Sequence, residues 1–277
     1  MPLSVFHVDA FTSKPFAGNP AAVCPLARWL DDAVLQSVAA ENNLSETAFF
    51  VPEGNSYLLR WFTPLCEVKL CGHATLASAF VLMQILDPKR ELVHFETRFS
   101  GSLEVRREND LFVMDFPALP PWRTQNPPAA LIKGLGKTPV EVVQIEDNYF
   151  AVYENARDVR ELRPDFRLVE QLHPAGVGIT AKGDETNEDA DFVSRYFAPS
   201  YGIPEDPVTG STHCSLAPYW AEKLGRTTLH ARQVSERGGE IWCEVKGDRV
   251  LIKGNAVLTM RGELLVDPAK LAAAKNY

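Results

Sequence analysis

The 277-residue chain is 45% hydrophobic and 23% charged, which is typical of a globular protein with room for two domains of ordinary size. Its formal net charge is −8 and it has no basic cluster, so the composition argues against nucleic acid and anionic membranes as partners. Five scattered cysteines without a zinc-like CxxC pair, and an N-terminus without the features of a signal peptide, predict a cytoplasmic protein with reduced thiols.

The first predicted elements are two strands joined by a turn-like segment. Residues 3–9 and 21–24 carry the β-branched and aromatic side chains that favour strands. Gly18-Asn19-Pro20 lies between them and has the composition of a turn. Asn19 is therefore either an ordinary turn residue or a polar group that points into a cleft.

An amphipathic helix and a further strand follow. Residues 31–41 place apolar side chains on one helical face, with Asp31 or Asp32 available as the N-cap. The next strand begins near Glu46, among apolar neighbours. Glu46 is either a solvated residue at the start of this strand or a desolvated acid–base group.

The centre of the first half is a helix that is apolar nearly all round. A strand at 57–63 ends at Pro64, and Cys71-Gly72-His73 precedes a helix predicted over 74–86. A helix with apolar side chains on every side is buried inside a domain. Its amino end carries backbone N–H groups without helical partners and a partial positive charge, so it can bind an anion without a cationic side chain.

Three more strands, at 92–97, 102–107 and 111–116, complete the first half. The proline-rich residues that follow have the composition of a linker.

We therefore predict an N-terminal domain over 1–117, a linker over 118–128 and a C-terminal domain over 129–267. The last segment, 268–277, which includes a short predicted helix, is a candidate for joining the N-terminal domain.

The second half repeats the order of the first. Its predicted elements are strands at 140–145, 150–153, 176–180 and 191–197, a short helix at 166–172, and a second apolar helix at 212–224 that Ser211 or Thr212 can cap. The same 138 positions separate Gly72 from Gly210 and Gly101 from Gly239.

This repetition predicts an α/β (α+β) protein with two pseudo-repeated domains. Each is expected to be a curled, mainly antiparallel sheet around a central apolar helix. The helix starts at Gly72 and Gly210 are expected to face one shared cleft.

Several groups near these helix starts could carry chemistry, and each also has a simpler interpretation. His73 either satisfies local backbone or binds a carboxylate, and Ser211 either caps its helix or also contacts a ligand. Asp206 precedes a proline and is either a loop aspartate or part of a site. No metal site is predicted, because the six histidines form no i, i+4 pair, and His213-Cys214 is expected to be core packing or a local hydrogen bond.

Four motifs together resemble those of the PhzF, or phenazine biosynthesis-like, family. They are Gly18-Asn19-Pro20, residues 43–48 (NLSETA), residues 71–75 (CGHAT) and residues 206–211 (DPVTGS), in the family's order and spacing over almost the whole chain. The family shares the fold of diaminopimelate epimerase, with two halves and the active site between them. The resemblance also implies a cofactor-free enzyme and a homodimer.

The resemblance implies a role for each matching residue. Glu46 matches the acid–base carboxylate that removes a proton from carbon and returns it elsewhere on the substrate. His73 and Asp206 match residues that assist the proton's passage. Gly72, Gly210, Ser211 and Asn19 fall at substrate-binding positions. The expected enzyme is an isomerase of a small cyclic or amino-acid-like carboxylate, because paired helix ends can stabilise the anion that forms when carbon loses a proton.

Two alternatives remain open. Related epimerases and proline racemases have a cysteine before each glycine, whereas here Thr209 stands at the second position, so a two-thiol racemase is not expected. A one-thiol dehydratase or isomerase that uses Cys71 is the first alternative, although Cys71 is otherwise an inert buried thiol. The second is a non-catalytic protein of the same fold that binds a metabolite or a partner.

Overall fold

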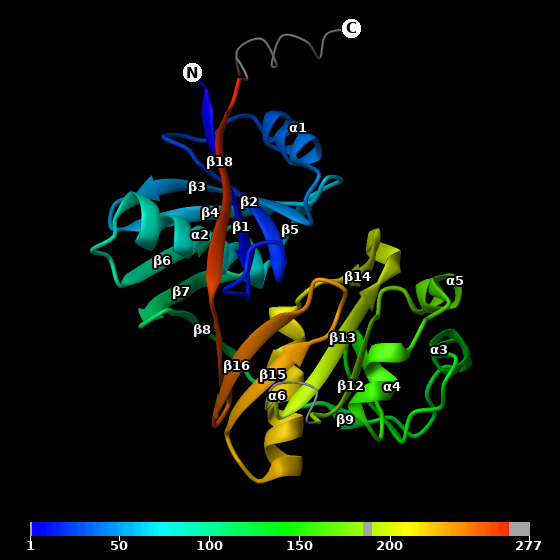
Figure 1. Cartoon of the computed structure of the whole chain (residues 1–277). Coiled ribbons are helices and arrows are strands. Elements are labelled where there is room, and N and C mark those ends of the chain that lie inside the picture. The colour runs from blue at the N-terminus through cyan, green and yellow to red at the C-terminus, as the bar shows by residue number, and fades with distance from the viewer. Residues whose placement is uncertain (1, 185–189, 266–277) are drawn as a thin grey trace, which may run out of the picture. The chain divides into compact units, whose positions relative to one another are not determined.

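The computed structural model of the chain describes residues 2–184 and 190–265 (Figure 1). These residues form two compact units, one built from residues 2–115 and 254–265 and the other from residues within 116–253. The short helix predicted within 268–277 lies outside the described residues. Among the helices of the described residues, none has the length and apolar character needed to cross a membrane.

The first unit is a mixed sheet with one internal and one external helix. Its elements are β1 (Leu3–Ala10), β2 (Asn19–Pro25), α1 (Asp32–Asn42), β3 (Glu46–Glu53), β4 (Ser56–Phe62), β5 (Glu67–Val68), α2 (Gly72–Phe80) with a π-helical continuation η1 (Val81–Leu86), β6 (Leu92–Thr97), β7 (Gly101–Glu108), β8 (Leu111–Pro117) and β18 (Ala256–Leu264). The strand order is β18-β1-β2-β3-β4-β6-β7-β8, and all pairs are antiparallel except β2–β3 and β4–β6. The two-residue β5 pairs with the end of β4.

The sheet of this unit curls around α2. This helix packs against β1, β2 and β3. At the far end of the sheet, Phe112 of β8 contacts Phe80 of the helix, with 5.8 Å between the ring centroids. Every residue from His73 to Ala79 is buried, because apolar or small side chains occupy all sides of the helix. On the outer face, α1 covers β3 with Val34, Leu35 and Val38.

The second unit has the same strand order with more helical cover. Its elements are β9 (Trp122–Arg123), α3 (Ala129–Leu135), β10 (Glu141–Ile145), β11 (Asn148–Val152), α4 (Ala156–Glu161), α5 (Phe166–Val169), η2 (Glu170–Leu172), β12 (Gly176–Lys182), β13 (Phe192–Ala198), η4 (Pro199–Tyr201), β14 (Ile203–Asp206), α6 (Gly210–Leu224), β15 (Thr228–Gln233), β16 (Gly239–Lys246) and β17 (Arg249–Gly254). The order is β9-β10-β11-β12-β13-β15-β16-β17, with β11–β12 and β13–β15 parallel and the other pairs antiparallel. The short β14 pairs with the end of β13, as β5 does with β4.

The helix α6 has the central position in this second sheet. Trp220 donates from its indole N–H to Thr180 Oγ1 in β12 at 2.9 Å and stacks on Phe192 of β13. Tyr219 donates to Glu141 Oε2 in β10 at 2.9 Å. The fold is therefore α+β, with a largely antiparallel sheet around one buried helix in each unit.

The structure divides the chain differently from the expected boundaries. Residues 256–264 were expected in the C-terminal domain, but β18 pairs along its length with β1 of the first unit. Within the expected linker, β9 pairs with β10, so the proline-rich segment adds an edge strand. The short helices α3 and α4 and the strand β15 were not predicted.

Candidate active site

Glu46 is the first residue of β3 and is buried, with 9% of its surface exposed. Asn43, in the left-handed conformation, ends α1 three residues earlier and turns the chain into the strand. Asn42 then donates to Thr47 Oγ1 at 3.1 Å, which ties the end of the helix to the start of the strand. Of the two interpretations of Glu46, the solvated one is wrong.

His73 is the second residue of α2 and lies between two other polar groups. Its Nε2 is 3.2 Å from Glu46 Oε2, although the angles of this contact are not those of a hydrogen bond. Its Nδ1 is 3.4 Å from Cys71 Sγ. Burial lowers the pKa of His73 to about 3, and a hydrogen bond with the Pro20 backbone opposes that shift. The imidazole is therefore neutral near pH 7 and can donate from one ring nitrogen while it accepts at the other.

The amino end of α2 leaves room for a ligand. Cys71, the N-cap residue, is extended and makes no side-chain cap hydrogen bond. A Cβ atom placed on Gly72 would meet no other heavy atom within 4 Å. A small anion can therefore approach the first-turn N–H groups closely.

Asn19 is the first residue of β2 and is fully buried, rather than part of an exposed turn. Gly18 precedes it with φ +64°, and a Cβ there would lie 2.2 Å from the Ala10 carbonyl oxygen, so only glycine fits this turn. Ala21, two residues later, lies opposite Glu46 in the parallel β2–β3 pair. Because side chains alternate along a strand, Asn19 and Glu46 lie on the same face of the sheet.

Asp206 is the last residue of β14, not a loop residue as expected. It accepts a short hydrogen bond from Thr209 Oγ1. Gln233 of β15 fixes the same segment, since its Nε2 donates to the Asp206 carbonyl at 2.7 Å and its Oε1 accepts from the Thr209 N–H at 2.8 Å. Gln233 was not singled out from the sequence, because a lone glutamine in a strand carries no motif.

Gly210 begins α6 and is buried, while Ser211, the second residue of the helix, is exposed. The expected caps Ser211 and Thr212 are wrong, because the helix starts earlier and Thr209 is its N-cap residue. The expected local bond of His213 is confirmed: its Nδ1 lies 2.8 Å from the Thr209 carbonyl oxygen. Burial lowers the pKa of His213 to about 4, so it too is neutral near pH 7.

The three side chains Glu46, Cys71 and His73 include donor atoms that all lie within 4.8 Å of one another. Thiolate, imidazole and carboxylate are also the ligand types of zinc sites. However, His73 presents Nδ1 to the thiol and Nε2 to the carboxylate, whereas a metal ion would bind one ring nitrogen only. The imidazole therefore lies between the thiol and the carboxylate.

Of the residues predicted to share one site, Glu46, His73, Gly72 and Asn19 all lie in the first unit. Asp206, Gly210 and Ser211 lie together in the second unit around the start of α6. That both groups serve one cleft stays a prediction. The sequence patterns gave no reason to expect the 3.4 Å contact between Cys71 Sγ and His73 Nδ1.

Comparison with known proteins identifies the family. The model of the phenazine biosynthesis-like (PhzC-PhzF) family matches residues 8–262. The chain belongs to the PhzF family. An uncharacterised isomerase of Pseudomonas aeruginosa is 51% identical over 264 residues, with 95% of this chain and 99% of that protein covered.

Solved structures agree with the family and with the fold. A PhzF family protein of Enterococcus faecalis has a TM-score of 0.91 at 46% identity and covers 96% of this chain and 100% of its own. A hydroxyproline epimerase of Agrobacterium vitis, at 12% identity, shares the fold with a TM-score of 0.59 over 98% of this chain and 94% of its own. The chain described here is therefore an isomerase of the PhzF family with an epimerase-like fold.

Proposed function

We propose that this PhzF protein moves a proton between carbon atoms of a small cyclic or amino-acid-like carboxylate, without a cofactor, and that Glu46 is the acid–base group. The observation that carries this proposal is a buried carboxylate 3.2 Å from a neutral imidazole at the open amino end of a buried helix. A general base for carbon must be shielded from water and placed beside groups that stabilise the resulting anion.

The proposed reaction begins when Glu46 removes a proton from a carbon of the bound substrate. The electron pair left on carbon is delocalised towards the substrate's carboxylate or ring. The first-turn N–H groups at Gly72 stabilise this negative charge. The protonated Glu46, whose proton exchanges in part with solvent, then protonates a different carbon as the double bond moves, so no oxidant or co-reactant is needed.

His73 is proposed to assist without changing charge. With a pKa of about 3, it remains an imidazole throughout and can orient the Glu46 carboxyl or donate to the substrate. Asn19, buried on the same sheet face as Glu46, is proposed to hydrogen-bond the substrate.

In the second unit, Asp206 is proposed to assist the proton's passage, and Gly210 and Ser211 are proposed to bind the substrate. Asp206 is held by Thr209, and Gly210 and Ser211 form the first turn of α6. Asp206 is half-buried and Ser211 is exposed, so their side chains suit the binding of a polar substituent at this helix start. The homodimer remains part of this proposal.

A second candidate uses Cys71 as the group that gains or loses the proton. The specific observation in its favour is the 3.4 Å contact between Cys71 Sγ and His73 Nδ1, since a ring nitrogen beside a thiol can accept its hydrogen bond and orient the sulfur. The carboxylate would then orient the imidazole.

The two candidates can be separated by deuterium exchange in D2O. A panel of cyclic and amino-acid carboxylates is incubated with the protein, and incorporation at carbon is followed by NMR and mass spectrometry. Under the carboxylate mechanism, Glu46→Gln lowers the rate by about 10²–10⁴-fold, while Cys71→Ala retains most of it. Glu53→Gln, an exposed carboxylate on the same strand, is the matched control.

The opposite pattern, in which Cys71→Ala loses exchange and Glu46→Gln keeps it, would establish the thiol mechanism instead. If the wild-type protein neither exchanges nor isomerises any of the carboxylates, proton transfer on this substrate class is refuted. If one carboxylate does exchange, a crystal soaked with it tests whether Gly72 and Gly210 both contact it.

A further inference from the structure

In each unit, an arginine holds a glutamate with two parallel hydrogen bonds. In the first unit, Arg60 donates from Nε and Nη2 to the two carboxylate oxygens of Glu67, at 2.7 and 2.8 Å. In the second unit, Arg195 donates from the same two nitrogens to Glu205, again at 2.7 and 2.8 Å. Two-point arginine–carboxylate pairs fix orientation as well as distance.

The two pairs occupy the same place in the repeated fold. Arg60 and Glu67 each precede one member of the cross-strand pair Trp61–Val68. Arg195 and Glu205 each precede one member of the corresponding pair, Tyr196–Asp206. In both units the second strand of the pair ends four residues before the first residue of the central helix.

The strands held in this way are too short to be fixed by their own ladders. β5 has two residues, and the β13–β14 pair contains a register irregularity. Each nevertheless leads directly into the segment that starts the central helix, α2 or α6. A short strand of this kind opens easily unless side chains hold it.

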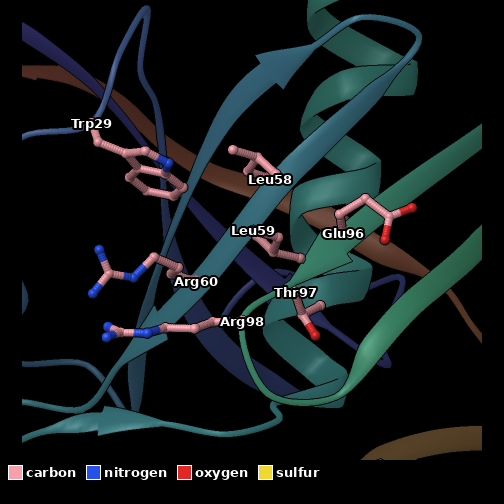
Figure 2. A pocket seen from close by; sticks show the side chains of 7 residues that line it. All are labelled: Trp29, Leu58, Leu59, Arg60, Glu96, Thr97 and Arg98. Carbon is pink, nitrogen blue, oxygen red and sulfur yellow. The ribbon is translucent and has the colours of Figure 1, made fainter.

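Further contacts fix each arginine from its other side. Arg60 Nη1 donates to Asp32 of α1 at 2.8 Å, and its guanidinium lies over the rings of Trp29 and Phe62. Figure 2 shows Arg60 beside Arg98 and near Trp29. These three side chains line a cavity of about 270 Å³. The guanidinium is thus held on a face covered by an outer helix.

Arg195 is fixed even more completely. Its Nη1 donates to the carbonyl oxygens of Val159 and Leu162, at the end of α4, at 3.1 and 2.7 Å. Its guanidinium lies 5.0 Å from the centre of the Phe197 ring, and 7% of its side chain is exposed. Every nitrogen of this guanidinium therefore has a partner.

We infer that Arg60 and Arg195 are positioning residues that hold the starts of α2 and α6 in place for the proposed reaction. They touch no reacting atom. Side chains alternate along a strand, so Glu205 is anchored on one face while Asp206 points to the other. The pairs act through residues 69–72 and 207–210. This inference rests on the proposed function for its catalytic consequence, but the positioning itself is measurable without substrate.

The test is amide hydrogen exchange on the ligand-free protein, combined with carboxylate turnover. In Arg60→Met, exchange of the Thr75 amide, which closes the first turn of α2 on the Cys71 carbonyl, should accelerate at least about tenfold, equivalent to about 1.4 kcal/mol of local opening, with the later turns of α2 unchanged. In Arg195→Met, the same should occur at the Thr209 amide, which donates to Gln233 Oε1. Turnover should fall by a similar factor in kcat, with a smaller change in KM.

Two further variants separate positioning from general stability. The charge-reversed pair Arg60→Glu with Glu67→Arg should restore slow exchange of the Thr75 amide in part, whereas Arg60→Glu alone should not. Arg106→Met, which removes a comparable but more exposed pair with Glu108 in β7, should leave exchange and turnover unchanged.

Uniform acceleration over the whole first unit in Arg60→Met would show a role in stability only and would overturn the inference. Unchanged exchange at the helix starts would do the same. Loss of the acid–base group gives a different result, because Glu46→Gln should abolish turnover while exchange of the Thr75 amide stays slow.

Discussion

The two units share a scaffold but differ at the position of the acid–base group. Phe62 and Phe197 occupy equivalent positions in the two units. Phe62 pairs with Thr47, the residue after Glu46. Phe197 pairs with Val177, the residue after Gly176. By this register, Glu46 of the first unit corresponds to Gly176 of the second. The carboxylate is therefore present once, and only the first unit can supply it.

In the second unit, another side chain fills the volume that Glu46 would need. A Cβ placed on Gly176 would lie 1.9 Å from the Tyr196 hydroxyl oxygen and 2.7 Å from Asn148 Oδ1. Tyr196 donates to that Asn148 oxygen at 2.6 Å, and burial raises the pKa of its phenol, so the group stays neutral. The repeat thus keeps the curled sheet in both units while placing ionisable chemistry in one.

The starts of α2 and α6 also differ in their ionisable side chains. Cys71 and His73 correspond, at the offset of 138, to Thr209 and Ser211. The first unit therefore has a thiol and an imidazole where the second has two hydroxyls. Hydroxyls of this kind can hold a substrate but are poor proton acceptors near pH 7. In the proposed function, the acid–base carboxylate accordingly belongs to the first unit, and the helix start of the second unit binds the substrate.

The largest expected effect is on the pH dependence of the unfolding free energy, to which the buried His213 contributes. Thr75 Oγ1 donates to the Cys71 carbonyl at 2.7 Å, and at the corresponding place His213 Nδ1 lies 2.8 Å from the Thr209 carbonyl. Burial lowers the pKa of His213 from 6.5 to about 4, so its contribution to stability is present above pH 6.5 and is lost as the pH falls towards 4. His213→Thr, which copies the first unit, should reduce the pH dependence of the unfolding free energy by about 1.4 kcal/mol per pH unit in this window.

Urea unfolding between about pH 7 and pH 4.5 measures this slope. His94→Thr, at a half-exposed histidine of β6, is the control and should leave the slope unchanged. An unaltered slope in His213→Thr would mean that this histidine is not neutral in the folded protein. His73, with a pKa lowered to about 3, should maintain its own contribution to the slope in both variants.

The next effect tests whether the second unit can accept a side chain where the first has Glu46. Gly176→Ala should lower the unfolding free energy by about 1–3 kcal/mol, because its Cβ would overlap the Tyr196 hydroxyl. Gly262→Ala in β18 is the matched strand control, since the nearest atom to its Cβ would be 3.8 Å away. If both variants were equally stable, the absence of a side chain at Gly176 would not be a packing requirement.

The sequence predicted those parts of the fold that depend on local pattern. The helices expected at 74–86 and 212–224 are present in α2 with η1 and in α6, because apolar residues on all sides of a helix give an unambiguous signal. The pairing of β18 with β1 carried no such signal. It joins residues about 250 positions apart, and Ala256–Leu264 is mostly half-exposed, so the domain boundary was placed by composition instead.

The candidate site was predictable as a set of residues but not as a geometry. Glu46 could be proposed from its apolar neighbours, yet its burial depends on the parallel pairing of β3 with β2. The contact between Cys71 and His73 arises from the extended N-cap conformation, which turns the thiol back towards the imidazole. Short-range sequence patterns do not encode either relation.

The smallest expected effect on stability separates binding from folding at the start of α2. A Cβ on Gly72 would meet no atom within 4 Å, so Gly72→Ala should change the unfolding free energy by less than about 0.5 kcal/mol. If a substrate carboxylate approaches the backbone here, the added methyl group should weaken binding about tenfold, or about 1.4 kcal/mol. Isothermal calorimetry with an exchanging carboxylate, beside urea unfolding of the same variant, measures both quantities. Equal affinity in Gly72→Ala and wild type would show that the anion does not bind at this helix start, and the proposed stabilisation of the carbanion would then need another source.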